Sequence, residues 1–261
     1  MSAPGFLQMM QNEILQEDTA GRELFGGADF DLVLLANFVH QVINPLNGVA
    51  GTLDNLAEGV IREEPRREQR LRAARAQVEE CITLMRNLAF LAHGFEKLPA
   101  RDRKVAVLPQ IIIESAMFFQ EDGKSRGILI SLEDRQTQNR VSGHPELLRQ
   151  VLMNIFDNCV KYSENDSVVE VDQRIQRRSN SAIIVIRNWS KLPMEVRDAQ
   201  KMFELGFRGA NARGVIASGT GLGMYISKRI VEDVHGGSLS VQVRKQRQLE
   251  FIIKLPHGQM P

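Results

Sequence analysis

The chain has 261 residues, of which 43% are hydrophobic and 25% charged, and its formal net charge is +1. This composition is typical of a globular protein with one or two domains, and the small net charge argues against a nucleic-acid or membrane-surface partner held by bulk charge. No apolar run is long enough to cross a bilayer. The two cysteines, Cys81 and Cys159, lie in apolar helical patterns in different predicted domains, which favours free buried thiols and a cytoplasmic location.

Residues 1–28 are interpreted as a short leader with one small amphipathic helix. The first long helix is expected to begin near Asp29 or Asp31, either of which can cap it, and to run to about Arg62. Its apolar residues alternate in steps of three and four, which is a heptad pattern. The seam consists of Leu32, Leu35, Val39, Val42, Leu46, Val49, Leu53, Leu56 and Val60.

A turn is expected at Pro65, followed by a second helix with the same spacing up to Phe95. Two such helices form an antiparallel hairpin, which leaves its seam half covered. Residues 29–98 are therefore expected to pair with a second copy in a homodimeric four-helix bundle. The arginine-rich turn is interpreted as a solvated end of the bundle, and docking of an acidic partner is the alternative.

His40 lies one residue off the heptad seam, beside Ile43 and Asn47. Its imidazole is therefore expected at the edge of the buried stripe, where a substrate can reach it. Pro45 cannot donate a hydrogen bond to the carbonyl of Gln41, so the helix should be kinked or loosened beside the histidine. A half-buried structural histidine is the alternative interpretation of these residues.

Residues 96–104 are polar, contain a proline and lack periodicity, so they are interpreted as an interdomain linker. The following segment, 105–258, mixes short strands with helices and predicts an α+β sandwich. The strands are expected at 105–107, 127–132, 168–175, 182–186, 239–243 and 249–255, and the helices at 109–120, 144–162 and 221–235. The stretch between 187 and 220 is expected to be irregular.

Asn154, Asn158 and Lys161 are spaced by four and three residues and share one face of the predicted helix 144–162. An amide can hold Mg²⁺ through its carbonyl oxygen, and a lysine can meet phosphate. The opposite face of the helix is apolar and is expected to pack on the sheet. A solvated polar face is the alternative.

A glycine-rich turn, Ser218–Met224, directly precedes the last predicted helix. Its glycines let the backbone approach an anion, and the helix N-terminus supplies unpaired N–H groups. The turn does not follow a strand in a βαβ unit, so a Rossmann dinucleotide site is not expected. In the segment before it, Arg208 and Arg213 are either phosphate contacts or solvated side chains.

Taken together, these motifs resemble the catalytic core of sensor histidine kinases of two-component systems. The block His40-Gln41-x-x-Asn44-Pro45-Leu46 resembles the phospho-acceptor box, and the segment from Asn154 to Ser163 resembles the asparagine box. Gly219-Thr220-Gly221-Leu222-Gly223 resembles the second glycine box, and the segment 202–209 resembles the phenylalanine box. The resemblance extends over about residues 30–256, nearly the whole chain.

The resemblance implies a GHKL-type ATP-binding domain with a Bergerat-type α/β sandwich, which binds ATP and Mg²⁺. It implies that His40 takes the γ-phosphoryl group and passes it to an aspartate of a response-regulator receiver domain. It assigns catalytic positions to His40, Gln41 and Asn44, where Asn44 orients a water for removing phosphate from the receiver. It assigns nucleotide contacts to Asn154, Asn158, Lys161, Tyr162, Asn188, Arg208, Gly219, Thr220, Gly221, Leu222 and Gly223, with Asn158 also at the metal.

Two positions depart from the family pattern. Gln41 replaces the acidic residue that acts as a base beside the histidine, and an amide cannot take a proton in that way. Asn188 replaces the aspartate that accepts a hydrogen bond from the adenine amino group, which removes the charge-assisted part of that bond. Trp189 and Lys191 are expected to crowd the loop that follows, so adenine binding should be weaker or the nucleotide preference relaxed.

Two other functions stay open. The departures at Gln41 and Asn188 favour a kinase-shaped scaffold that acts mainly as a response-regulator phosphatase or phosphotransfer hub, with little autokinase activity. The third candidate is a related ATPase in which closure around nucleotide does mechanical work. Steady ATP hydrolysis without phosphate transfer to His40 would favour that third candidate.

Overall fold

The computed structural model describes residues 32–93, 102–209, 221–245 and 247–257. The chain divides into two compact units, residues 1–94 and 95–261. The expected leader, both expected caps of the first helix, most of the expected linker, Arg213, Gly219 and Thr220 lie outside the described residues. Within the described part of the chain, no helix is both long enough and apolar enough to cross a membrane.

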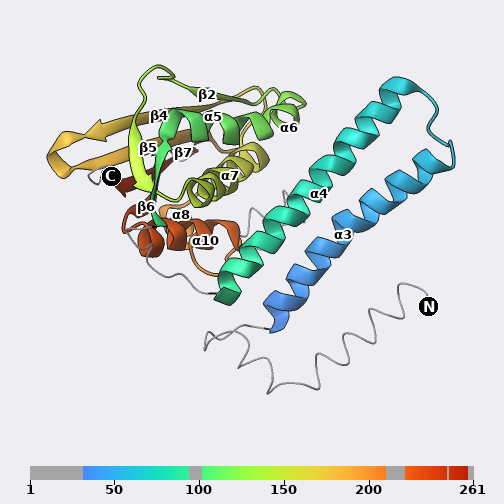
Figure 1. The fold of residues 1–261 in the computed structure, drawn as a ribbon, viewed down its shortest axis with the longest axis horizontal. Coiled ribbons are helices and arrows are strands. Elements are labelled where there is room, and N and C mark those ends of the chain that lie inside the picture. The colour runs from blue at the N-terminus through green and yellow to red at the C-terminus, as the bar shows by residue number, and fades with distance from the viewer. Residues whose placement is uncertain (1–31, 94–101, 210–220, 246, 258–261) are drawn as a thin grey trace. The chain divides into compact units, whose positions relative to one another are not determined.

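The first unit contains two long helices that pack against each other, α3 (Leu32–Ala57) and α4 (Glu64–His93) (Figure 1). The first helix ends five residues before the expected Arg62, because Gly59 adopts a left-handed φ of 67° that terminates it. Pro65 lies in the first turn of α4 rather than in the connecting turn. Proline fits there because the first helical N–H groups need no intrahelical acceptor.

The heptad seam of the hairpin is only partly covered within one chain. Cys81 is 4% exposed, and its thiol lies 3.6 Å from the carbonyl oxygen of the seam residue Val42 on the facing helix; Phe38, beside the seam residue Val39, is also 4% exposed. Leu46 and Leu53, one heptad apart on α3, stay exposed. A hairpin has room to bury one side of each seam, and the other side faces outward.

The second unit is built on a five-stranded sheet with the strand order β2-β4-β5-β7-β6. The β2–β4 pair is parallel and the other neighbours are antiparallel. The bounds are β2 Leu129–Leu132, β4 Val168–Gln176, β5 Ser181–Trp189, β6 Ser238–Arg244 and β7 Gln248–Pro256. A separate antiparallel pair joins β1 (Lys104–Val107) to β3 (Arg140–Gly143). This mixed sheet confirms the predicted α+β class.

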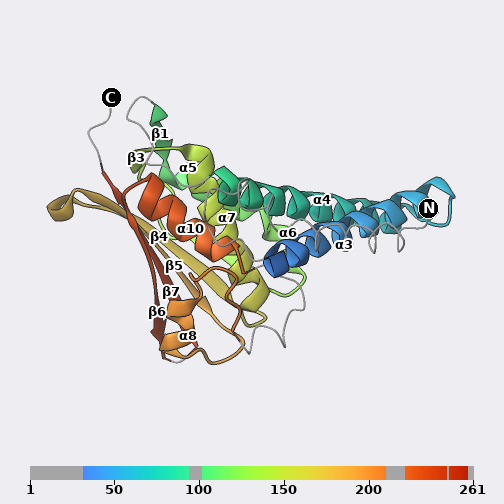
Figure 2. The ribbon, with the colours of Figure 1, turned by 90° about the horizontal axis from the view of Figure 1, so that it is seen from below.

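Three helices cover one face of the large sheet: α5 (Leu108–Phe118), α7 (Pro145–Tyr162) and α10 (Gly223–Arg229) (Figure 2). The core lies between these helices and the alternate strand residues that face them; Ile155, Phe156 and Ile186 are each 0% exposed. The remaining helical segments are α6 Gln120–Lys124, η2 Arg177–Ser179, α8 Val196–Lys201 and the π-helical turn η3 Ile230–Val234. Strand β3 and helix α8 were not expected, because both are short and carry no clear periodicity.

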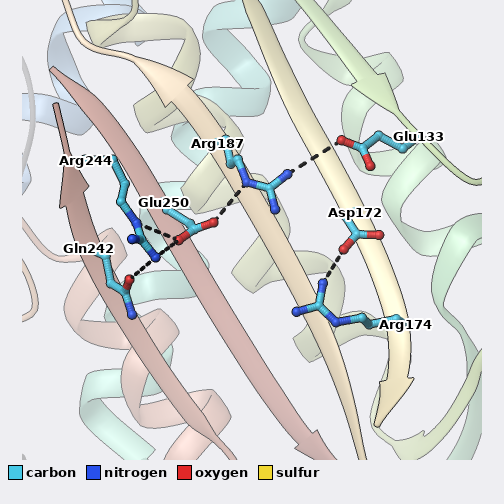
Figure 3. Close-up of polar contacts among 7 residues, drawn as sticks. All are labelled: Glu133, Asp172, Arg174, Arg187, Gln242, Arg244 and Glu250. Atoms are coloured by element: carbon cyan, nitrogen blue, oxygen red, sulfur yellow. Dashed lines mark hydrogen bonds and ion pairs between the residues drawn. The ribbon is translucent and has the colours of Figure 1, made fainter.

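The face of the sheet without these helices carries a ladder of ion pairs (Figure 3). Arg187 on β5 pairs with Glu250 on β7 at 2.9 Å and with Glu133 at 3.6 Å, and Arg244 on β6 reaches the second oxygen of Glu250 at 3.2 Å. Burial of Glu250 opposes its ionisation, but the two arginines outweigh that effect and hold the pKa of the carboxyl below its ordinary value. Charged side chains line this face around the buried Ile183 and Val185 of β5, and the core beneath the helices lies on the other face.

Candidate nucleotide site between α7, β5 and α10

Helix α7 is held firmly at the end that carries the expected site residues. Pro145 begins the helix, and the guanidinium of Arg126 closes the other end by donating to the carbonyl oxygens of Val160, Lys161 and Ser163. The bonds to Lys161 and Ser163 measure 3.3 and 2.8 Å. A cation at this terminus satisfies carbonyls that have no intrahelical donor and complements the helix dipole.

The predicted polar face of α7 divides into a buried part and a half-exposed part. Asn154 is 7% exposed, and its side-chain amide donates to the carbonyl of Gly223 at 2.9 Å and to the hydroxyl of Ser227 at 3.1 Å. Its oxygen accepts from Gln150 at 3.2 Å. The amide of Asn154 therefore joins α7 to α10.

Asn158, Lys161 and Tyr162 are half-buried at the C-terminal end of α7. Lys161 pairs with Asp157 at 2.8 Å, and with 29% of its side chain exposed the ammonium can still meet an anion. Within the described residues, no group of three or more His, Cys, Asp or Glu side chains could hold a metal ion. A magnesium ion at Asn158 would therefore need phosphate oxygens and waters for most of its ligands.

The described end of the glycine-rich turn packs tightly against the chain. Gly221 has a φ of 67°, and a Cβ there would lie 2.7 Å from the carbonyl carbon of Gly206 and 2.8 Å from the carbonyl oxygen of Phe207. Leu222 is 0% exposed, and a Cβ on Gly223 would lie 3.4 Å from the side chain of Asn154. The phenylalanine-box segment therefore requires a glycine at 221. Arg208, near the end of this segment, is half-buried.

Strand β5 ends at the expected adenine position. Asn188 is 2% exposed and lies on the strand face that the helices cover, two residues beyond the fully buried Ile186. Its amide nitrogen donates to the Ser163 hydroxyl at 3.0 Å, and its oxygen is buried without a partner among the described residues. Strand alternation places Trp189 on the opposite sheet face, so its ring does not crowd Asn188.

The segment after Asn188 continues the strand pairing instead of forming a glycine turn. Ser190 forms an antiparallel bridge with Ser163, and the N–H of Lys191 donates to the carbonyl of Tyr162 at 2.8 Å. Arg247 donates to the carbonyls of Ser190 and Lys191 at 3.2 and 2.7 Å and pairs with Glu164. These hydrogen bonds hold the segment in an extended conformation, where a glycine-rich loop would be flexible.

The imidazole of His235 connects two elements of the second unit. It is 4% exposed; its Nδ1 lies 2.8 Å from the carbonyl of Ile230, and its Nε2 accepts the backbone N–H of His144 at 3.0 Å. These contacts assign the proton to Nδ1 and a neutral ring. Burial lowers the pKa of His235, and the nearby Arg103 and His144 act in the same direction. The ring thereby ties the π-helical turn η3 to the start of α7.

The phospho-acceptor box lies on α3 in the first unit. His40 and Asn44 are exposed and stand one turn apart, and Gln41 between them is half-buried. Helix α3 continues through Pro45. Within a single chain, the side chain of His40 is therefore open to solvent.

Three residues of the site were missing from the sequence prediction: Arg126, Ser163 and Arg247. Ser163 had a signal, since it directly follows Tyr162 in the asparagine-box segment. The two arginines had none, because each acts on backbone carbonyls that only the fold brings near it.

Residues 143–259 match the family described as histidine kinase-, DNA gyrase B-, and HSP90-like ATPases. This domain therefore belongs to that ATPase family, and the chain carries a histidine kinase catalytic core with a GHKL-type ATP-binding domain, as its motifs suggested.

Among curated proteins, the chain is 31% identical over 219 residues to the sensor histidine kinase AruS of Pseudomonas aeruginosa, which covers 80% of this chain and 21% of AruS. It is 23% identical to the sensor histidine kinase YcbM of Bacillus subtilis, over 85% of this chain and 70% of YcbM. The chain thus spans only about a fifth of AruS. A crystal structure of histidine kinase ThkA in complex with response regulator protein TrrA is similar in fold, with a TM-score of 0.57 at 17% identity, over 96% of this chain and 67% of that chain.

Proposed function

We propose that this chain is an ATP-dependent protein-histidine kinase core that phosphorylates its own His40 and passes the phosphoryl group to a response-regulator aspartate. One observation carries the proposal. The same chain holds an exposed histidine in a block that resembles the phospho-acceptor box, and a GHKL-type domain in which the buried oxygen of Asn188 has no partner among the described residues. The other ATPases of the superfamily lack the histidine hairpin.

The residues of the second unit fit ATP chemically. The buried oxygen of Asn188 has no hydrogen-bond partner among the described residues and can accept a hydrogen bond from a purine, and the half-exposed Lys161 carries a positive charge for phosphate. Asn158 would hold Mg²⁺ through its amide oxygen, and the ion would neutralise charge on the phosphates. Asn154 has a different part, because its amide is committed to Gly223 and Ser227. It positions the glycine turn.

In the proposed step, a ring nitrogen of neutral His40 attacks the γ-phosphorus. The new N–P bond replaces the bond from phosphorus to the β,γ-bridging oxygen, and ADP leaves. The imidazole must then lose its proton to solvent, because Gln41 cannot accept it. A positioned general base contributes about 10²–10⁴-fold in rate, so autophosphorylation is expected to be slow by that order.

We also propose that residues 29–98 form the hairpin domain and residues 105–258 the ATP-binding domain, and that the hairpin forms a homodimer. Leu46 and Leu53 lie seven residues apart on α3 and are 45% and 52% exposed, and Val60, seven residues further and beyond the end of the helix, is 65% exposed. The same spacing recurs on α4, at Leu71, Val78 and Met85, all of them exposed. Two exposed apolar stripes on adjacent helices are what a second hairpin would cover in a four-helix bundle.

The proposed partner is the receiver domain of a response regulator. The solved complex of ThkA with a response regulator supports this choice by similarity of fold. Asn44 is exposed one turn from His40, where its amide can orient water for hydrolysis of the receiver's acyl phosphate. Both cysteines are free and buried, and burial raises the pKa of the Cys159 thiol, which fits the proposed cytoplasmic location.

A second candidate is favoured by two specific residues. Gln41 removes the base, and Asn188 removes the charge from the adenine contact. A protein with both changes can keep its bundle and its receiver-docking surface while it loses autokinase activity. In that case the protein acts mainly as a phosphatase or phosphotransfer scaffold.

The deciding experiment incubates the whole chain with γ-labelled ATP and Mg²⁺, with His40→Ala and Asn158→Ala beside the wild type. His257→Ala is the matched control, a histidine outside the hairpin. Acid-labile, base-stable label on the wild type and the control, absent from the other two, supports the kinase. Absence of label on folded wild-type protein refutes autokinase activity. Loss of receiver dephosphorylation in Asn44→Ala would then support the scaffold.

A further inference from the structure

The buried oxygen of Asn188 has no hydrogen-bond partner within the described part of the chain. The residue is 2% exposed. Most buried polar atoms are hydrogen-bonded, and leaving one unpaired costs free energy. Its place at the end of β5, beside the C-terminus of α7, is where the family resemblance puts the base. Within the described part of the chain, this oxygen is therefore available as an acceptor for a donor on a ligand.

The other end of the same amide is held by one hydroxyl. The amide nitrogen of Asn188 donates to Ser163 at 3.0 Å, and Ser163 is 0% exposed. Its backbone is fixed on both sides, since its N–H donates to Cys159 at 2.9 Å and its carbonyl accepts from Arg126 at 2.8 Å. The bridge to Ser190 adds a third constraint. Ser163 therefore cannot move away from the amide.

The chemistry of this pair differs from that of a carboxylate. A serine hydroxyl can either accept a hydrogen bond or donate one. If the Asn188 amide turns over, the hydroxyl donates to Oδ1 and the bond to Ser163 is kept. The amide nitrogen then points to the base in place of the oxygen. A carboxylate at this position has only acceptors in both orientations.

We propose that the Asn188–Ser163 pair reads position 6 of a purine ring in both of its common forms. A 6-amino group donates to the amide oxygen, and after the amide turns over a 6-oxo group accepts from the amide nitrogen. The site therefore takes purine nucleoside triphosphates with either substituent. This inference deepens the proposed function and depends on it only in requiring that the second unit binds nucleotide.

The test is isothermal titration calorimetry of the whole chain in the presence of Mg²⁺, which measures the binding affinities for ATP and for inosine triphosphate. The second nucleotide carries a 6-oxo group and a proton on the neighbouring ring nitrogen, and it lacks the 2-amino group that guanine would add. The wild type should bind the two with affinities within about tenfold of each other. Asn188→Asp should keep ATP binding and weaken inosine triphosphate binding, so that the ratio rises at least tenfold.

Ser163→Ala tests the role of the hydroxyl as a positioning group. It removes the partner of both amide orientations equally, so both affinities should fall together and their ratio should stay within about threefold of the wild-type ratio. Ser167→Ala is the control, because that hydroxyl bonds only to the local carbonyl of Glu164 among the described residues. Its affinities should match the wild type.

Two outcomes overturn the proposal without touching the proposed function. One is a wild type that prefers ATP as strongly as Asn188→Asp does. The other is a wild type that binds ATP much more tightly than inosine triphosphate, with a preference that is lost in Ser163→Ala. That result would mean that the hydroxyl holds the amide in one orientation. Failure of folded wild type to bind either nucleotide overturns the proposed function, and this inference with it.

Discussion

The amide of Asn154 should stabilise the ATP-binding unit rather than contact ligand. Asn154→Ala removes two donated hydrogen bonds and one accepted bond at a position that is 7% exposed. The carbonyl of Gly223 keeps the Ser227 hydroxyl as a donor at 2.8 Å, so it is not left unpaired. Because each bond contributes about 1 kcal/mol net, the loss should be about 2–3 kcal/mol of unfolding free energy.

Urea denaturation followed by tryptophan fluorescence measures this loss, because Trp189 is the only tryptophan of the chain and lies in the second unit. The matched control is Asn158→Ala, one turn along the same helix and half-exposed. It should change stability by less than about 0.5 kcal/mol while it abolishes Mg²⁺-dependent nucleotide binding. Equal stability losses in the two variants, or no loss in Asn154→Ala, would refute the assignment of a structural role to Asn154 and a ligand-binding role to Asn158.

Three further outcomes are expected. Leu53→Glu places a charge in the exposed stripe of α3, so the chain should sediment as a monomer where the wild type sediments as a dimer; an unchanged dimer would refute that interface. Gly221→Ala should cost about 2 kcal/mol or more in urea denaturation, because φ is 67° and Gly206 blocks a Cβ, whereas Gly209→Ala, with open space around it, should be neutral. The lowered pKa of His235 means that the unfolded state takes up the proton first; stability should therefore fall as pH drops below about 6.5, and His235→Gln should flatten that slope.

The ion-paired face of the sheet contrasts with the exposed stripes of the hairpin. Arg187 and Arg244 both pair with Glu250, so this face carries charged side chains that are already matched with one another. Leu53 and Val60 have no such compensation. The association of two copies is therefore expected through the hairpin and not through the sheet.

The sequence by itself determined the elements whose signals are local. The heptad spacing from Val42 to Leu56 predicted a helical pair, and the spacing of Asn154, Asn158 and Lys161 predicted one polar helix face. Motif resemblance also predicted the GHKL-type domain, which the family match confirmed. These inferences succeed because helical periodicity and a contiguous motif need no knowledge of distant partners.

Only the tertiary structure decided what each side chain of the site contacts. Asn154 meets Gly223 across 69 residues, and Ser163 meets Asn188 across 25 residues, at distances that no local pattern encodes. The requirement for glycine at 221 comes from the backbone of Gly206 and Phe207, and the alternation along β5 places Trp189 on the sheet face opposite to Asn188. Hydrogen bonds and close packing act over a few ångströms in space, so their partners are fixed only when the sheet and its helices have assembled.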